Sequence, residues 1–180
     1  MDSQNIYYLN VFLGGGAILL QIFAVAAFVV LFLGPKRNKF LAFIDKHYLA
    51  LGFLISLSAS LFSLVYSEIV GFVPCYLCWY QRVFMFPLPF IFGMAIWHKD
   101  RKIVKYVLPL LSVGFLVAVY QNFFYYFGSG SSLPCDASGV SCYQQLINVF
   151  GYISFPMLSL TAFLALLAVT LVAHFYKAED

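Results

Sequence analysis

The chain has 180 residues, of which 63% are apolar and only 9% are charged, with a net charge of +3. Soluble domains carry about 25% charged residues, and a soluble core of this size would not hide so much apolar surface. The composition therefore excludes an ordinary soluble enzyme and indicates a membrane protein. The basic residues lie in short segments between apolar stretches and not on one face, which argues against nucleic-acid binding.

The first apolar stretch, residues 11–33, is long enough to cross a bilayer, for which about 20 apolar residues suffice. The segment before it contains Asp2 and no Lys or Arg, so we expect a permanent transmembrane helix and not a signal peptide. We assign residues 1–34 to this additional N-terminal helix, and residues 35–180 to the main membrane domain.

The second apolar stretch is residues 48–67, and the third, residues 83–97, is short for a crossing. A helix that begins near Cys75 would be long enough, would contain Arg82, and would be kinked by Pro87 and Pro89. The fourth stretch is residues 106–127, and the fifth is about residues 152–173. Between them lies a polar loop, residues 128–145. The sequence thus predicts an all-α membrane protein, a bundle of five transmembrane helices.

The orientation follows from the basic residues, which collect on the cytoplasmic side of membrane proteins. If the chain alternates across the membrane, nine of its ten Lys and Arg residues fall on one side and Arg82 alone falls on the other. We therefore predict an external N-terminus and a cytoplasmic C-terminus. All four cysteines then lie outside, where disulfides persist, and this agreement is independent because the cysteines were not used to place the loops. The nine residues are Lys36, Arg37, Lys39, Lys46, Lys99, Arg101, Lys102, Lys105 and Lys177.

Cys75 and Cys78 form a C-x-x-C motif directly after Pro74, at the expected start of the third helix. Proline suits the first turn of a helix, and the partial positive charge there favours the thiolate that attacks disulfides. The spacing puts both sulfurs on one face. Zinc sites also use this motif, but the three histidines fall on the predicted cytoplasmic side, and the spacing of Cys135 and Cys142 is poor for zinc. We expect no metal.

Two polar residues lie within the expected spans. Arg82 follows Cys78 by four residues and therefore lies one turn deeper on the same face. An ionisable residue in a membrane is a functional candidate, although an arginine also anchors a helix by snorkelling. Beside the C-x-x-C motif we favour a functional role, in which the cation stabilises a Cys78 thiolate and binds a quinone oxygen. Gln121 is expected to hydrogen-bond a neighbouring helix, with a quinone contact as the alternative.

Cys135 and Cys142 lie in the polar loop, after a flexible Gly-Ser run at residues 128–132. One interpretation is a structural disulfide that closes the loop. The other is a mobile redox pair that meets a soluble partner and then exchanges with the Cys75–Cys78 pair. We favour the redox pair, because a static disulfide gains little from a flexible approach.

The segment Pro74-Cys75-Tyr76-Leu77-Cys78-Trp79-Tyr80-Gln81-Arg82 resembles the signature of the DsbB family of membrane thiol oxidases and of its BdbC-like relatives. The order of spans and cysteine pairs also matches, and the resemblance covers about residues 48–173. The first span departs from the family, whose well-known members have four spans. The close spacing of the second pair is nearer the BdbC-like pattern. The related vitamin K epoxide reductases place C-x-x-C on their last span, unlike this chain.

The resemblance implies a thiol oxidase of the bacterial inner membrane that reoxidises a soluble DsbA-like protein and reduces ubiquinone or menaquinone. Cys135 would form the mixed disulfide with the partner, and Cys142 would pair transiently with Cys75. Cys78, with Arg82 beside it, would face the quinone. The short loop leaves direct exchange between the intact pairs open. We expect a monomer without a nucleic-acid partner.

Two other classes of function remain open on the sequence. A non-enzymatic membrane scaffold would keep both cysteine pairs permanently oxidised, and a metal-handling protein would bind zinc or copper. The chain has neither a C-x-x-C-H haem motif nor a G-x-G-x-x-G flavin fingerprint. This favours an external electron acceptor over a tightly bound cofactor.

Overall fold

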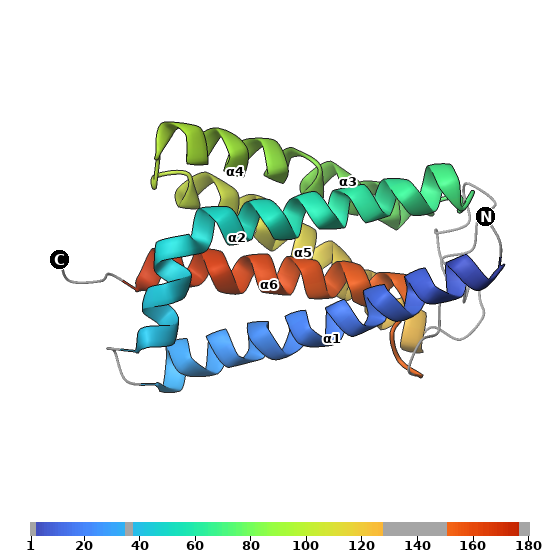
Figure 1. The fold of residues 1–180 in the computed structure, drawn as a ribbon, viewed down its shortest axis with the longest axis horizontal. Helices are drawn as coiled ribbons and strands as arrows, with labels where there is room; N and C mark the ends of the chain where they lie inside the picture. The colour runs from blue at the N-terminus through green and yellow to red at the C-terminus, as the bar shows by residue number, and fades with distance from the viewer. Residues whose placement is uncertain (1–2, 35–37, 128–150, 177–180) are drawn as a thin grey trace.

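The computed structural model describes residues 3–34, 38–127 and 151–176, and all secondary-structure elements given for these ranges are helices. Apart from the first turns of α2, which run across one end, they run lengthwise through an elongated bundle (Figure 1), and successive lengthwise segments run in opposite directions. We call the end where α3 begins the cysteine end, and the end where α4 stops the basic end. The helices are α1 (Ser3–Leu33), α2 (Lys39–Leu64), the π-helical η1 (Val65–Ile69), α3 (Tyr76–Met85), α4 (Pro87–His98), α5 (Val104–Phe127) and α6 (Phe155–Phe175).

Local hydrogen bonds set the two ends of α2. Asn38 caps its N-terminus, because its side-chain oxygen accepts a hydrogen bond from the Phe40 N–H at 2.8 Å. At the cysteine end the helix widens into η1, where the Val70 N–H donates to the Val65 carbonyl at 3.1 Å. Gly71 follows with a φ of 79°, a left-handed conformation that glycine adopts without strain. The chain thereby turns back toward the start of α3.

The helices α3 and α4 form one crossing with a break at Phe86. Pro87 and Pro89 cause the break, because neither has an N–H to donate to the carbonyl one turn earlier. Pro87 then lies in the first turn of α4, where a missing N–H has no cost. The prediction of a helix that begins near Cys75 and is kinked by these prolines is confirmed.

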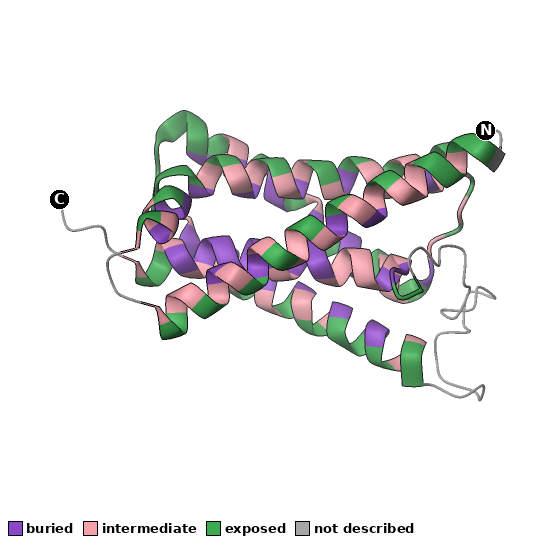
Figure 2. Cartoon of the chain, turned by 60° about the horizontal axis from the view of Figure 1, so that its bottom comes forward, coloured by how far each residue is buried: buried purple, intermediate pink, exposed green. Residues whose placement is uncertain are grey.

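The helix α6 lies at the centre of the bundle and carries much of its buried surface, whereas α1 is largely exposed (Figure 2). Two glycines let neighbouring helices approach closely, as small residues do in membrane bundles. A Cβ at Gly52 of α2 would lie 2.6 Å from the Phe92 ring of α4. A Cβ at Gly114 of α5 would overlap the Phe163 ring of α6. Both rings are fully buried in the core that holds α4, α5 and α6 together.

Four helical segments are long and apolar enough to cross a membrane. The kinked α3–α4 unit as a whole is of comparable length, although neither half is long enough alone. The prediction of an all-α polytopic membrane protein is confirmed, while the number of crossings and their orientation stay predictions. The four segments are Gln4–Leu33, Lys39–Ile69, Val104–Phe127 and Phe155–Phe175.

The second helix begins earlier than its uncharged stretch, at Lys39 and not near residue 48. The charged residue that bounds this stretch, Lys46, is exposed, and the first turns of α2 run across the end of the bundle (Figure 1). Asp45 is only 5% exposed, and its carboxylate forms an ion pair with Arg101, which also lies over the Tyr48 ring. A helix can begin before its apolar stretch when its charged residues are exposed or paired, so hydropathy located the apolar stretch but not the start of the helix.

Candidate functional site

The C-x-x-C motif lies at the N-terminus of α3. Cys75 is the N-cap residue, and its carbonyl accepts the first helical hydrogen bond, from the Trp79 N–H at 3.1 Å. Cys78 stands one turn later, and the two sulfurs lie 2.8 Å apart. Cys75 is buried, at 3% exposure, whereas Cys78 is partly exposed. The pair is thus held in a geometry suited to forming and breaking a disulfide, beside the positive end of a helix.

The side-chain amide of Gln121 on α5 reaches both sulfurs. Its Nε2 donates to Cys75 Sγ at 3.3 Å and to Cys78 Sγ at 3.4 Å. Its Oε1 accepts a hydrogen bond from Gln81 Nε2 at 2.6 Å, and both glutamines are buried. This bond fixes which end of the Gln121 amide faces the cysteines. The expected helix–helix hydrogen bond of Gln121 is therefore present, and the same side chain is also the neutral donor nearest the thiols.

Arg82 is 9% exposed and turns from α3 toward α2. Its Nε donates to Ser63 Oγ at 2.9 Å, and its Nη2 donates to the Ser63 carbonyl at 2.8 Å. The guanidinium also lies 5.3 Å from the ring centre of Trp79 and 5.8 Å from that of Phe86. Within the described ranges no carboxylate forms an ion pair with it. A buried cation that no carboxylate of the described residues pairs with is able to bind a ligand oxygen that carries or develops negative charge.

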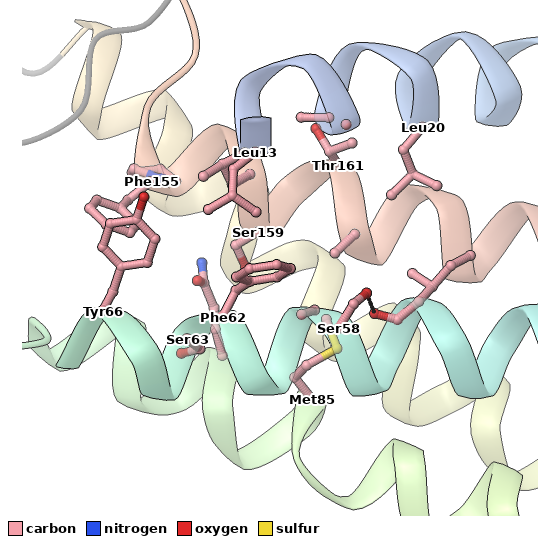
Figure 3. Close-up of a pocket in the computed structure, with 18 of the residues that line it drawn as sticks. Leu13, Leu20, Ser58, Phe62, Ser63, Tyr66, Met85, Phe155, Ser159 and Thr161 are labelled. Carbon is pink, nitrogen blue, oxygen red and sulfur yellow. Dashed lines mark hydrogen bonds between the residues drawn. The ribbon is translucent and has the colours of Figure 1, made fainter. Parts of the chain in front are cut away.

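A cavity of about 690 Å³ lies among α1, α2, α3, α5 and α6. Its polar corner contains Cys78, Gln81, Arg82 and Gln121, while Cys75 does not line it. The remaining wall is mainly apolar. In Figure 3, α1 and α2 lie on opposite sides of the cavity, with α6 and its Ser159 and Thr161 between them. One sulfur of the pair therefore faces a space that a largely apolar molecule can enter.

Aromatic rings lie at the cysteine end of this cavity. The Phe155 ring packs edge-on against Tyr66 at 4.6 Å and is stacked on Phe72 at 4.9 Å, measured between ring centres (Figure 3). The Tyr66 hydroxyl donates to Asn10 Oδ1, which joins α1 to η1 at the same end. All three rings line the cavity.

The structure brings together four of the residues chosen from the sequence: Cys75, Cys78, Arg82 and Gln121. Cys135 and Cys142 lie outside the described residues. Among the described residues, no three His, Cys, Asp or Glu side chains gather in a way that would hold a metal ion. His47, His98 and His174 lie on helix segments at the basic end, away from the cysteine pair.

The sequence interpretation missed three contributors to the site. Gln81 lies in the motif, but no role was predicted for it. A glutamine within a span is itself a signal for a helix–helix hydrogen bond. Ser63 gives no signal, because serines are common in α2. The part of α1 in the cavity wall was also missed, since hydropathy does not show which helices a membrane span packs against.

The comparisons with known proteins agree with this geometry. A family model described as "Disulfide bond formation protein DsbB" matches residues 45–173. "Probable disulfide formation protein C 2" of Bacillus anthracis is 40% identical over 124 residues, which cover 69% of this chain and 88% of the relative. "Disulfide bond formation protein C" of Bacillus subtilis (strain 168) is 39% identical over 120 residues, covering 67% and 87%. No solved structure matches the chain.

The matched region begins after α1 and extends into α6. It includes both cysteine pairs, together with Arg82 and Gln121. A match that covers most of the chain, supported by relatives at about this identity, establishes the family. The chain belongs to the DsbB family of disulfide bond formation proteins, which are all-helical membrane oxidoreductases.

Proposed function

We propose that this protein is a thiol:quinone oxidoreductase that forms disulfides outside the cytoplasm and reduces a membrane quinone. The soluble electron donor is a thioredoxin-fold dithiol protein of the DsbA type. The family match supports disulfide formation. The donor and the quinone are proposed from the site and from the family resemblance.

The observation that carries the proposal is the position of the cysteine pair at the wall of a mainly apolar cavity. Cys78 lines the cavity, and Cys75 is buried behind it. A lipid-soluble acceptor that enters the mainly apolar cavity meets the Cys78 sulfur, the Arg82 guanidinium and the Gln121 amide in one corner. A mainly apolar cavity would not favour the binding of a water-soluble acceptor.

The reaction moves two electrons through two cysteine pairs. The reduced partner attacks the Cys135–Cys142 disulfide through Cys135, and the partner leaves oxidised while this pair becomes a dithiol. That dithiol then reduces the Cys75–Cys78 disulfide by thiol–disulfide exchange. The Cys78 thiolate finally delivers two electrons to the quinone, which takes up two protons to give the quinol, and the Cys75–Cys78 disulfide forms again.

The residues around Cys78 would assist this last step electrostatically. Arg82 holds its charge under all ordinary conditions, and its guanidinium is desolvated, so it favours negative charge on a quinone oxygen. The Gln121 amide donates to both sulfurs and so stabilises a thiolate there. The hydrogen bonds to Ser63 hold Arg82 in place during the reaction.

The proposed cellular location is the bacterial inner membrane, with the cysteine end of the bundle outside the cytoplasm. The charge distribution supports this orientation, because nine of the ten Lys and Arg residues fall on the side predicted to be cytoplasmic. Arg101 and Lys102 lie at the basic end, opposite the cysteine pair. The same orientation gives the loop cysteines access to a soluble partner in an oxidising compartment.

The test is quinone reduction by the purified protein with excess reduced dithiol partner. We expect Arg82→Ala to lower quinone reduction by roughly one to two orders of magnitude, because one lost charge-assisted hydrogen bond costs about 1.5–3 kcal/mol. Arg82→Lys should recover only part of the rate, since lysine lacks the planar fork. Lys105→Ala, an exposed basic residue at the basic end, serves as the control. A wild-type protein that reduces no quinone, with both pairs permanently oxidised, would instead identify a structural scaffold.

A further inference from the structure

The helix α1 lies outside the family match, yet it builds one wall of the cavity that Cys78 faces. The match begins at residue 45, and α1 ends at Leu33. Leu13 and Leu20 of α1 face the cavity opposite Phe62 and Ser58 of α2 (Figure 3). The relatives are covered over 87–88% of their length by a match that leaves about a third of this chain uncovered. This wall is therefore an addition to the matched domain.

Specific hydrogen bonds attach α1 to the rest of the bundle. Gln21 Nε2 donates to Thr161 Oγ1 of α6 at 2.9 Å, and Gln21 Oε1 accepts from the Tyr152 hydroxyl at 3.1 Å. Near the cysteine end, Asn10 accepts from Tyr66. The helix packs chiefly along α6 and meets α2 at few places. The position of α1 is thus fixed at two levels, with the cavity between it and α2.

A contact between α1 and α2 shows how far the α1 residues lie from the Arg82 corner of the cavity. Phe12 lies 6.5 Å from Phe62, measured between ring centres, and Ser63 next to Phe62 binds Arg82. Gly16 follows Phe12 by one turn, which is about 6 Å further toward the basic end. The Arg82 corner therefore corresponds to the head group of an occupant, and the level of Gly16 corresponds to what extends beyond it.

We propose that α1 is the tail-binding wall of the acceptor cavity, along which the isoprenoid chain of the quinone lies while its ring occupies the corner of Cys78 and Arg82. This inference rests on the proposed function. The aromatic cluster of Tyr66, Phe72 and Phe155 lies at the cysteine end, so the chain extends the other way, between α1 and α2. The chain is already in an apolar medium in the bilayer, so the wall selects it by shape and not by hydrophobic transfer.

Gly16 offers a direct way to fill this space. It lines the cavity, and a Cβ built on it meets no atom within 4 Å. A Cβ on the neighbouring Gly15 also meets nothing within 4 Å, but Gly15 does not line the cavity. Gly16→Phe and Gly15→Phe therefore make the same change at adjacent helix positions, one into the cavity and one away from it.

The experiment compares a quinone with a long isoprenoid chain and a quinone with the same ring and no chain. In Gly16→Phe we expect the KM for the long-chain quinone to rise about tenfold or more, as expected for overfilling an occupied space. The KM for the chainless quinone should stay within about twofold of wild type. Gly15→Phe should leave both values unchanged. Gly16→Leu provides the same comparison if Gly16→Phe is not recovered folded.

A binding measurement separates the effect from turnover. Trp79 lies beside Arg82, and the chain has two tryptophans, so Trp97→Phe leaves Trp79 as the single tryptophan, which is excited selectively at wavelengths that tyrosine does not absorb. Quenching of Trp79 by the long-chain quinone should weaken in Gly16→Phe and persist in Gly15→Phe. Equal quenching and equal KM values in the two variants would overturn the role of α1 while leaving quinone reduction intact. A wild-type protein that reduces neither quinone would instead overturn the proposed function.

Discussion

Replacing Gln121 with leucine tests whether the buried amide stabilises the reactive thiolate. The amide donates to both sulfurs, at 3.3 and 3.4 Å, but only Cys78 lines the cavity, so one hydrogen bond acts on the electron-donating sulfur. A hydrogen bond to a charged group contributes about 1.5–3 kcal/mol. We therefore expect Gln121→Leu to slow electron delivery to the quinone roughly tenfold to a hundredfold.

Part of the effect of this substitution is structural and must be subtracted. Gln81 Nε2 loses its acceptor, and a buried donor without a partner costs about 1–3 kcal/mol of stability. Asn122→Leu is the matched control, because Asn122 is the next residue of α5. It is also buried, and it donates to the carbonyls of Ala118 and Pro156 and not to sulfur.

The assay mixes pre-reduced protein with excess quinone in a single turnover, and thermal unfolding in detergent is measured for each variant. Gln121→Leu and Asn122→Leu should lower the unfolding temperature to a similar degree. Only Gln121→Leu should slow the turnover. If both variants slow it equally, the amide acts through packing, and the argument that it stabilises the thiolate is wrong.

Two further predictions concern the loop and the topology. In Cys142→Ala the resolving thiol is gone, so a mixed disulfide between Cys135 and a small external thioredoxin-fold protein should accumulate on non-reducing gels. Full partner oxidation in both the Cys135→Ser and the Cys142→Ser variants would contradict the relay. A reporter fused after Asp180 should be cytoplasmic and a tag before Asp2 external, because nine of the ten basic residues fall on one side. An external C-terminus would reverse the orientation and remove the redox argument with it.

Much of the fold could be predicted from the sequence because apolar stretches and prolines act on the chain locally. Uncharged stretches of sufficient length predicted the membrane helices. The proline before Cys75 and the prolines at 87 and 89 predicted where the third crossing begins and kinks. These features depend only on chain neighbours. The start of α2 could not be predicted in this way, because its first turns carry exposed charges such as Lys46, and the Asp45 charge is paired with Arg101, which is 56 residues distant in sequence.

The arrangement of the site was predicted only where it lies within one helix. Helical spacing placed Arg82 one turn from Cys78, but it did not show that the guanidinium is bound by Ser63 of another helix. The contact of Gln121 with both sulfurs depends on how α5 crosses α3, and no local pattern encodes that crossing. The wall formed by α1 depends in the same way on its packing against α6.

The motif at residues 74–82 is specific for this family because it sets the residues on two faces of one short helix. Cys78, Gln81 and Arg82 share the face that lines the cavity, with Cys75 buried one turn earlier. Three aromatic residues that lie between them, Tyr76, Trp79 and Tyr80, are 42–56% exposed and present their rings outward, where an aromatic belt would lie. A shift of any inward residue by one position would turn it by about 100° toward the exposed face. The spacing therefore determines which of these side chains reach the cavity, which explains why C-x-x-C alone predicts less than C-x-x-C followed by Gln and Arg.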